Sequence, residues 1–403
     1  MSALEAFGNA GFRRYYIAAV SGVNGNWIFR VLLSWSAWDL TNSPSFVGLI
    51  AGLSLLPVAI VGPLFGAWTD RRPILSSFKL VSYGLLTPPL ALFLLLITGL
   101  LTPPMVVVIA LGFGVAIAAY HPVRQSLGPR LVEPPQIGSV VSLAALNFNL
   151  GRLLSPAIGG FLIGAVGMEL AALISVGLFL PNLVLGPTLR PREKFADGER
   201  QGFLADLAEG LRAGWQRIGV RRSLMLTIAG LGPVRAVTEL LALIADGEFD
   251  QGAQGLGLLT SAVGAGALLA AIFQVVAGPR LAAMALVRYG VIAAGFAGTA
   301  ALTLAPNFHM ALLCAPLAGF AGTYVGVTLQ IGIQSRIEDE LRARIMSLWM
   351  LSVTLSTSVL AFLISALSEV LGLGGATAWV LGVASVAVLA LAMTRKRQGY
   401  DPR

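Results

Sequence analysis

Charged residues are scarce in this chain of 403 residues, since Asp, Glu, Lys and Arg together make up only 11% of it. Soluble proteins of ordinary composition carry about 25% charged residues. Apolar residues make up 56% of the chain, and they occur in long runs that short polar gaps separate. The composition therefore predicts a polytopic all-helical membrane protein and excludes a soluble enzyme.

Cysteine and histidine are also nearly absent, with one Cys and two His in the whole sequence. Cys314 lies in an apolar run, which excludes a disulfide framework and a cysteine-based metal site. The polar gaps of the sequence contain no phosphate-binding loop of the Walker type, no group of metal ligands and no nucleophile–base pair. We therefore expect no enzyme activity, no cofactor and no ATP-driven pumping.

The basic residues occupy alternate gaps. Of 27 Lys and Arg residues, 24 lie near the termini or in five of the gaps between apolar runs. These basic gaps are 70–79, 124–130, 190–222, 280–288 and 336–344. Because Lys and Arg near span ends stay in the cytoplasm, both termini should be cytoplasmic and the number of spans even. The net charge of +8 forms short collars that face lipid headgroups, so no nucleic-acid partner is expected.

The apolar runs are long enough for twelve transmembrane helices, at about 20 residues for each crossing. We predict spans near residues 15–38, 46–68, 77–98, 103–122, 138–164, 169–188, 223–245, 255–278, 284–304, 309–332, 345–368 and 372–393. The domains would be a six-helix bundle at 1–188, a cytoplasmic linker at 189–222, and a second six-helix bundle with a basic tail at 223–403. In the linker, apolar residues recur every three or four positions, which predicts an amphipathic helix on the membrane surface. Its apolar stripe is Leu204, Leu207, Leu211, Trp215 and Ile218.

The two halves of the sequence resemble each other. VGLIAG from Val47 aligns with LGLLTS from Leu256, and QSLGPRLV from Gln125 aligns with QIGIQSRI from Gln330. Both offsets are close to half the chain length, which favours a duplication of a six-span unit. A parallel duplication of this kind predicts two pseudo-symmetric bundles with a cavity where they meet.

Several segments are similar to one known family. GAWTDRRP from Gly66 resembles the loop motif of the major facilitator superfamily, and NLGRLLSPAIGG from Asn149 resembles the span-five motif of its exporters. With GNWIFRVLLSWSAWDLT from Gly25, PVRQSLGPRLV from Pro122 and RIEDELRARIMSL from Arg336, the chain resembles the enterobactin-exporter-like branch. The resemblance covers nearly the whole sequence.

This resemblance implies a secondary transporter with the major facilitator fold in the bacterial cytoplasmic (inner) membrane. Because the sequence shows no ATP-driven machinery, we expect a small amphipathic molecule, siderophore-like or drug-like, to be exchanged for protons by alternating access, and the resemblance implies that the direction is export. The expected partners are the small-molecule substrate, protons and membrane lipids, and we expect a monomer. The direction of transport depends on the resemblance alone, because composition does not encode it.

The loop motif comprises Gly66, Asp70, Arg71 and Arg72, and Pro73 ends it earlier than in the family pattern. The Asp70 carboxylate could accept hydrogen bonds from helix N-terminal amides or pair with arginines when the cytoplasmic helix ends close. The resemblance implies this gating role. The alternative is a solvated turn that only sets the topology.

The span-five motif comprises Gly151, Pro156, Gly159 and Gly160, with Ser155 where the family pattern has glycine before the proline. Small residues at these spacings permit close approach of helices, and proline interrupts the backbone ladder. The resemblance implies that the same residues also seal the transport path. We expect Pro156 and Gly160 to serve in both packing and gating.

Two ionisable residues lie close together in the predicted seventh span. Arg235 and Glu239 are four residues apart, hence on one helical face, where they could pair. A self-satisfied ion pair is one interpretation. In the other, Glu239 takes up a proton or Arg235 binds an anionic substrate, because charges inside a bilayer normally face a cavity or a partner.

Arg30 and Arg152 lie in the first and fifth spans, with no acidic residue within one helical turn. Each therefore needs a partner from another helix, from a backbone carbonyl or from substrate. Polar residues near them on the same two spans are Asn24, Asn26, Asn147 and Asn149. We predict either a polar wall of the cavity or a set of interhelical hydrogen bonds. Trp27 could pack or stack on a flat substrate, and His121 is expected to be an interfacial residue.

Two other functions fit the same fold. A lysolipid or lipid flippase would take its substrate laterally from the bilayer. A transport-dead receptor or assembly factor would show no proton-coupled flux, and the scarcity of acidic residues inside the spans keeps this alternative open.

Overall fold

The computed structural model describes residues 5–69, 72–192, 212, 214–335, 337 and 339–397, and every regular element among them is helical. Asp70, Arg71 and the residues Leu204, Leu207 and Leu211 of the predicted amphipathic helix lie outside the described residues. The gating function of the loop motif and the surface helix of the linker therefore stay predictions.

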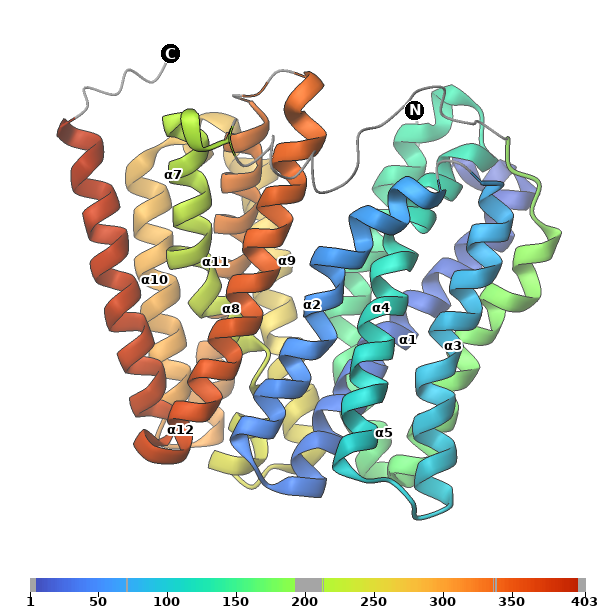
Figure 1. Ribbon diagram of the computed structural model, residues 1–403, viewed down its shortest axis with the longest axis horizontal. Coiled ribbons are helices and arrows are strands. Elements are labelled where there is room, and N and C mark those ends of the chain that lie inside the picture. Colours follow the sequence, from blue (N-terminus) through green and yellow to red (C-terminus); the bar gives the residue numbers. More distant parts are fainter. Residues whose placement is uncertain are drawn as a thin grey trace. The chain divides into compact units, whose positions relative to one another are not determined.

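The first half of the sequence folds into long helices joined by short turns (Figure 1). The helices are α1 (Ala10–Thr41), α2 (Pro44–Thr69), α3 (Ile74–Ile97), α4 (Pro103–Leu127) and α5 (Ile137–Leu185). The 3-10 turns are η1 (Glu5–Gly8), η2 (Gly128–Leu131), η3 (Pro134–Gln136) and η4 (Gly186–Thr188). Local chemistry fixes the ends of α1. The Asn9 side chain accepts hydrogen bonds from two amides of the first turn, and Asn42 closes the helix with a left-handed φ of 48°.

The second half contains α7 (Ile218–Leu226), η5 (Thr227–Leu231), α8 (Gly232–Thr238), η6 (Leu243–Glu248), α9 (Gly252–Ala283), α10 (Ala285–Thr303), α11 (Phe308–Gln334) and α12 (Asp339–Arg397). Two of these elements, η5 and η6, are π-helical. The predicted seventh span at 223–245 is therefore a series of short helical pieces. Pro233, in the first turn of α8, has no backbone N–H to continue the ladder from the preceding turn.

Single glycines divide the two longest helices. Gly167 in α5 has φ 83° and ψ 167°, and Gly372 in α12 has φ 70° and ψ 161°. Only glycine adopts these backbone angles without strain. The 49 residues of α5 would extend about 73 Å as one straight helix, more than twice the roughly 30 Å of a hydrocarbon core. Each break lies at the short gap where the sequence separated two spans.

Eight of the described helices are long and apolar enough to cross a membrane, and α5 and α12 are among them. The chain is thus a polytopic membrane protein. Helix α1 and the α7–α8 segment are not among the eight. The pieces of the α7–α8 segment are each shorter than a span, and α1 carries Arg30 and several asparagines between its apolar residues.

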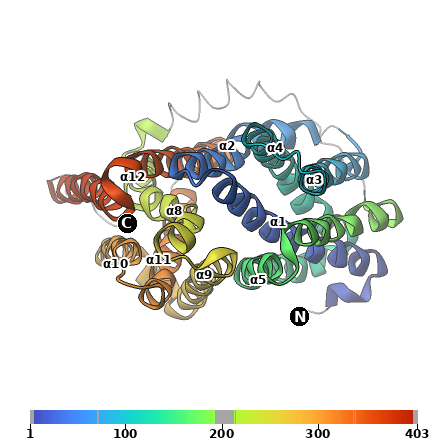
Figure 2. The ribbon, with the colours of Figure 1, turned by 90° about the horizontal axis from the view of Figure 1, so that it is seen from below.

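The chain divides into two compact units. The first unit comprises Met1–Ser43, Leu53–Arg200 and Ala245–Ser261, and the second comprises Pro44–Gly52, Gln201–Ile244 and Ala262–Arg403. In the first unit α1 lies along α5 (Figure 2), and α3 packs against α4 and α5. In the second unit α10 packs on α11, and α12 packs on α8. The units follow the sequence halves except for two segments, the start of α2 and the start of α9 with the connector before it.

Candidate functional site

In the first unit, one face of α5 meets α1 through small residues. Gly151, Ser155 and Gly159 are four residues apart, so they share a helical face. A Cβ atom added at Gly151 would lie 2.6 Å from Val23 Cγ1, so a larger residue there would require Val23 or one of the helices to shift. The Ser155 hydroxyl donates a hydrogen bond of 2.5 Å to Asn24 Oδ1. The structure thus brings the predicted first and fifth spans together.

Arg30 and Trp27 lie at this α1–α5 contact. The Arg30 guanidinium carbon is 5.5 Å from the centroid of the Trp27 ring, within the range of a cation–π interaction. The Trp27 ring meets Phe148 of α5 edge to face, with 5.8 Å between centroids. Trp27 therefore packs between an arginine of its own helix and an aromatic ring of α5.

The other polar residues predicted on these spans lie in different settings. Asn147 is buried at 5% exposure, whereas the Asn149 amide donates to the Ala145 carbonyl of its own helix at 2.9 Å. Asn26 and Arg152 are partly buried on α1 and α5. Both Arg30 and Arg152 interact with other groups of the protein. Whether these residues line a substrate path stays a prediction.

A second polar group joins α1, α4 and the last part of α5. The Tyr120 hydroxyl donates to Asn182 Oδ1 at 3.5 Å, and Arg124 lies 5.8 Å from the Tyr120 ring centroid. Gly22 makes room for this contact, because a Cβ atom there would lie 2.9 Å from Asn182 Nδ2 and 3.2 Å from the Tyr120 hydroxyl. His121 follows Tyr120 in α4 and is thus next to this group.

The other face of the span-five motif contacts the start of α9, which belongs to the same unit. A Cβ atom at Gly257 would lie 2.7 Å from the Pro156 carbonyl oxygen and 3.1 Å from Gly160 Cα. The Ala157 N–H donates to Ser261 Oγ at 3.0 Å. Backbone therefore meets backbone at this crossing, as small residues permit in membrane helices.

In the second unit, Arg235 and Glu239 flank the end of α8. Arg235 lies in the last turn, where a cation is favourable for the helix dipole, and Glu239 is the C-terminal cap residue. The aliphatic part of the Arg235 side chain packs near Gly322 of α11. A Cβ atom added at Gly322 would lie 3.9 Å from Arg235 Cγ. The chain leaves the helical ladder directly after Glu239, and both side chains are partly buried and interact with other groups.

Two residues of the loop motif, Gly66 and Arg72, lie in the described part of the chain. Gly66 falls within α2, and the exposed Arg72 lies with its guanidinium 4.4 Å from the centroid of the Trp68 ring. Arg72 therefore stacks on an aromatic residue of the preceding helix end.

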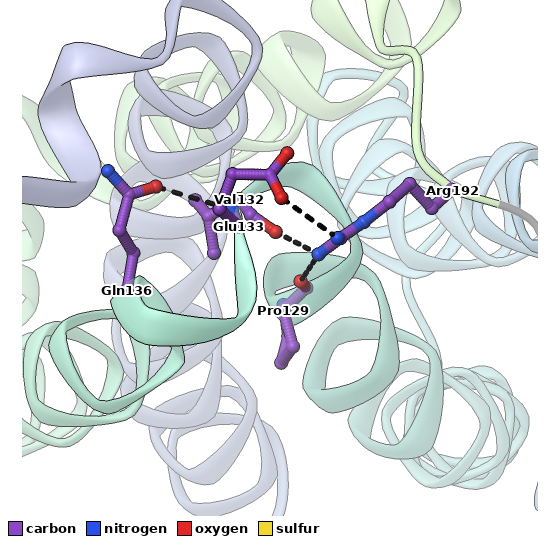
Figure 3. Close-up of polar contacts among 5 residues, drawn as sticks. All are labelled: Pro129, Val132, Glu133, Gln136 and Arg192. Carbon is purple, nitrogen blue, oxygen red and sulfur yellow. Dashed lines mark hydrogen bonds and ion pairs between the residues drawn. The ribbon is translucent and has the colours of Figure 1, made fainter.

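Arg192 forms a contact that sequence reasoning did not find (Figure 3). Its guanidinium donates to the Glu133 carboxylate at 3.4 Å, to the Pro129 carbonyl at 3.4 Å and to the Val132 carbonyl. Its backbone N–H donates to the Arg130 carbonyl at 3.0 Å. The segment that follows η4 is thereby fixed to the turn between α4 and α5. No local pattern in the sequence pairs these segments.

A hydrogen bond of α1 was also not predicted. Trp38 Nε1 donates to Asp246 Oδ2 at 2.7 Å, and Asp246 Oδ1 accepts from the Gly252 N–H at 2.8 Å. One carboxylate thus joins the end of α1 to the first residue of α9. Among the described residues, no group of His, Cys, Asp and Glu could hold a metal ion.

Solved transporter structures share this fold. A POT family transporter in complex with 5-aminolevulinic acid has a TM-score of 0.72 at 13% identity, with 97% of each chain covered. The nucleoside transporter NupG gives 0.68 at 13% identity, covering 97% of this chain and 100% of the other. An inward-facing, unoccupied bacterial homologue of the human lysosomal transporter Spinster gives 0.66 at 15% identity, with coverage of 97% and 99%.

No curated protein sequence matches the chain at a significant level. A family model does match, and it covers residues 1–398. The model is that of the transmembrane secretion effectors, and its match to nearly the whole chain agrees with the transporter fold of the solved structures. The chain therefore belongs to the transmembrane secretion effector family of major facilitator superfamily transporters.

Proposed function

We propose that this protein is a secondary active transporter with twelve spans in two six-helix bundles. It exports a small amphipathic molecule, siderophore-like or drug-like, in exchange for protons by rocker-switch alternating access. Two features support this span count. The glycine breaks would make two spans each of α5 and α12, which raises the eight candidate helices to ten spans, and α1 and the α7–α8 segment would add one span each.

One observation carries the proposal: the interruption of the seventh span at Glu239, with Arg235 one turn before it. Transporters commonly build their substrate and coupling-ion sites from discontinuous transmembrane helices. An acidic residue at such a break is a candidate for proton uptake, because an ionisable group inside a membrane is expensive to retain without a function. Glu239 would be the proton carrier and Arg235 its counter-charge. The remaining candidates, Arg30, Asn26, Asn149 and Arg152, would contribute polar surface from the first bundle.

The test is flux in proteoliposomes under an imposed pH gradient. A catecholate siderophore, a cationic dye and a lysophospholipid would be compared, with native protein, Glu239→Gln and the matched control Glu248→Gln. Glu248 lies in η6 and is exposed, so its neutralisation should leave flux unchanged. The proposal expects gradient-driven flux that Glu239→Gln abolishes.

Each contrary result has a separate meaning. Undiminished flux in Glu239→Gln would remove the proton-coupling assignment and leave secondary transport in place. Transport of the lysophospholipid alone would identify a lipid flippase. Absence of flux for all three compounds would contradict the transporter proposal and favour the receptor function.

A further inference from the structure

The first unit contains several buried hydrogen-bond donors that lack acceptors. Four are side-chain N–H groups, and in the described part of the chain they have no hydrogen-bond partner: Trp27 Nε1, Arg124 Nε, Asn147 Nδ2 and Asn182 Nδ2. They lie on α1, α4 and α5. Among the described residues of this unit, the other buried side-chain atoms without a hydrogen-bond partner are the Ser77 and Ser175 hydroxyls, which can either donate or accept.

Positive charge accompanies these donors. Arg30 stacks on Trp27, and Arg124 lies over the Tyr120 ring. The donors are also linked through close helix contacts. A Cβ atom added at Gly151 of α5 would lie 3.4 Å from Trp27 Cδ1 of α1. Asn147 precedes Gly151 by one helical turn, so Trp27 and Asn147 share the α1–α5 contact.

Carboxylates that could accept from these donors are missing from the interior of the same helices. Among the described residues of α1, α4 and α5, the acidic residues are Asp39, in the last turn of α1, and Glu169, directly after the break at Gly167. A buried donor without an acceptor is unfavourable, and for Trp27, Asn147 and Asn182, which lie inside predicted spans, the bilayer has no water that could replace the missing acceptor. The excess of donors and cations therefore calls for an acceptor from outside the chain.

We infer that α1, α4 and α5 of the first unit bind the anionic, acceptor-rich group of the transported molecule, a carboxylate or a phosphate. Arg30 and Arg124 supply charge, while Trp27 and Asn147 donate hydrogen bonds to its oxygens. This inference rests on the proposed transport function and narrows its substrate class to amphipathic anions. The anion could belong to a free solute or to a lipid headgroup, since both present the same oxygens.

The test measures binding to the purified full-length protein in nanodiscs of neutral lipid. Two pairs of probes separate charge from shape: 4-octylbenzoate against 4-octylbenzamide, and lysophosphatidylglycerol against monoacylglycerol. The inference expects the charged member of at least one pair to bind about tenfold more tightly than its neutral partner. Preference for octylbenzoate indicates a free solute, and preference for the lysolipid alone indicates a headgroup. Equal binding within both pairs, or no binding of either charged probe, overturns the inference.

Two substitutions locate the site. Asn147→Leu removes a buried orphan donor, so it should raise the melting temperature of the unliganded protein and weaken the charged probe about tenfold. Trp27→Phe keeps an aromatic ring against Phe148 but removes the indole N–H, and it should weaken the same probe to a similar degree. The matched control Trp379→Phe alters a side chain that is 54% exposed on α12, and should change neither value. Unchanged affinity in both Asn147→Leu and Trp27→Phe contradicts the assignment.

The outcomes also separate this inference from the transport proposal. Charge-selective binding without flux for any compound would retain the anion site and refute the transporter function. Gradient-driven flux of octylbenzamide at the rate of octylbenzoate would retain transport and refute the anion site.

Discussion

The crossing of α5 and α9 offers a sharp test of the packing in the first unit. Gly257→Ala would place a Cβ atom 2.7 Å from the Pro156 carbonyl oxygen and 3.1 Å from the Cα atoms of Ala157 and Gly160. These are backbone atoms, which cannot rotate away as a side-chain end could. To reach ordinary contact at 3.4 Å or more, the two helices must separate by about 0.7 Å, and close-packed interiors resist such a shift.

The expected loss of stability follows from two opposing effects. Overpacking of this kind costs about 1–3 kcal/mol, while replacing glycine by alanine inside a helix returns up to about 1 kcal/mol. The separation also lengthens the hydrogen bond from the Ala157 N–H to Ser261 Oγ, one turn further along α9. Loss of such a hydrogen bond costs about 0.5–1.5 kcal/mol of stability. Because the lost hydrogen bond and the gain from alanine are of similar size, we expect Gly257→Ala to lower the free energy of unfolding by about 1–3 kcal/mol.

The assay is the free energy of unfolding in mixed micelles as the fraction of denaturing detergent rises. The matched control is Gly177→Ala, also in the first unit, where an added Cβ meets nothing within 4 Å. The control should be as stable as the native protein or more stable by up to about 1 kcal/mol. If Gly257→Ala proves as stable as Gly177→Ala, the close backbone crossing is refuted.

Three further substitutions should change the free energy of unfolding in the same assay. Trp38→Phe removes the donor to the Asp246 carboxylate and should cost about 1.5–3 kcal/mol; a loss near zero would mean that the bond contributes nothing. Gly372→Ala forces alanine into φ 70° and should cost about 1–3 kcal/mol, whereas Gly382→Ala, with nothing within 4 Å, should not destabilise; equal values would contradict the break. Asn307→Ala removes the cap that accepts from the Met310 N–H and should cost about 1 kcal/mol, and an unchanged value would show that the cap is dispensable.

The sequence predicted the helices well where composition determines them. Hydropathy placed a short gap between residues 164 and 169 and another between 368 and 372, and the structure turns at Gly167 and at Gly372. A helix that crosses a bilayer needs a run of about 20 apolar residues, and such runs can be recognised from composition alone. The predicted seventh span differs, because hydropathy depends on its apolar residues and carries no information on the hydrogen-bond pattern that makes η5 and η6 π-helical.

Contacts between distant segments were beyond sequence reasoning for a different physical reason. Trp38 and Asp246 are 208 positions apart, and Arg192 and Glu133 are 59 apart. Neither pair has a periodicity or a motif, since only the packing of helices brings its members together. The polar residues of the predicted first and fifth spans were expected to line a cavity or to form interhelical hydrogen bonds, and in the structure the Ser155 hydroxyl of α5 donates to Asn24 Oδ1 of α1. The function of those residues stays a prediction.

The span-five motif illustrates what a motif encodes and what it omits. From the sequence, Gly159 and Gly160 are two adjacent small residues of one packing motif, and Gly160 was expected to serve in gating as well. In the structure they face different helices: a Cβ at Gly159 would meet Ile28 and Val31 of α1, and one at Gly160 would meet Ala253 and Gly257 of α9. Adjacent positions on a helix point about 100° apart, so one short motif can serve two contacts. Separate substitutions therefore test separate contacts, and a flux defect confined to Gly160→Ala would assign the gating function to the α5–α9 crossing.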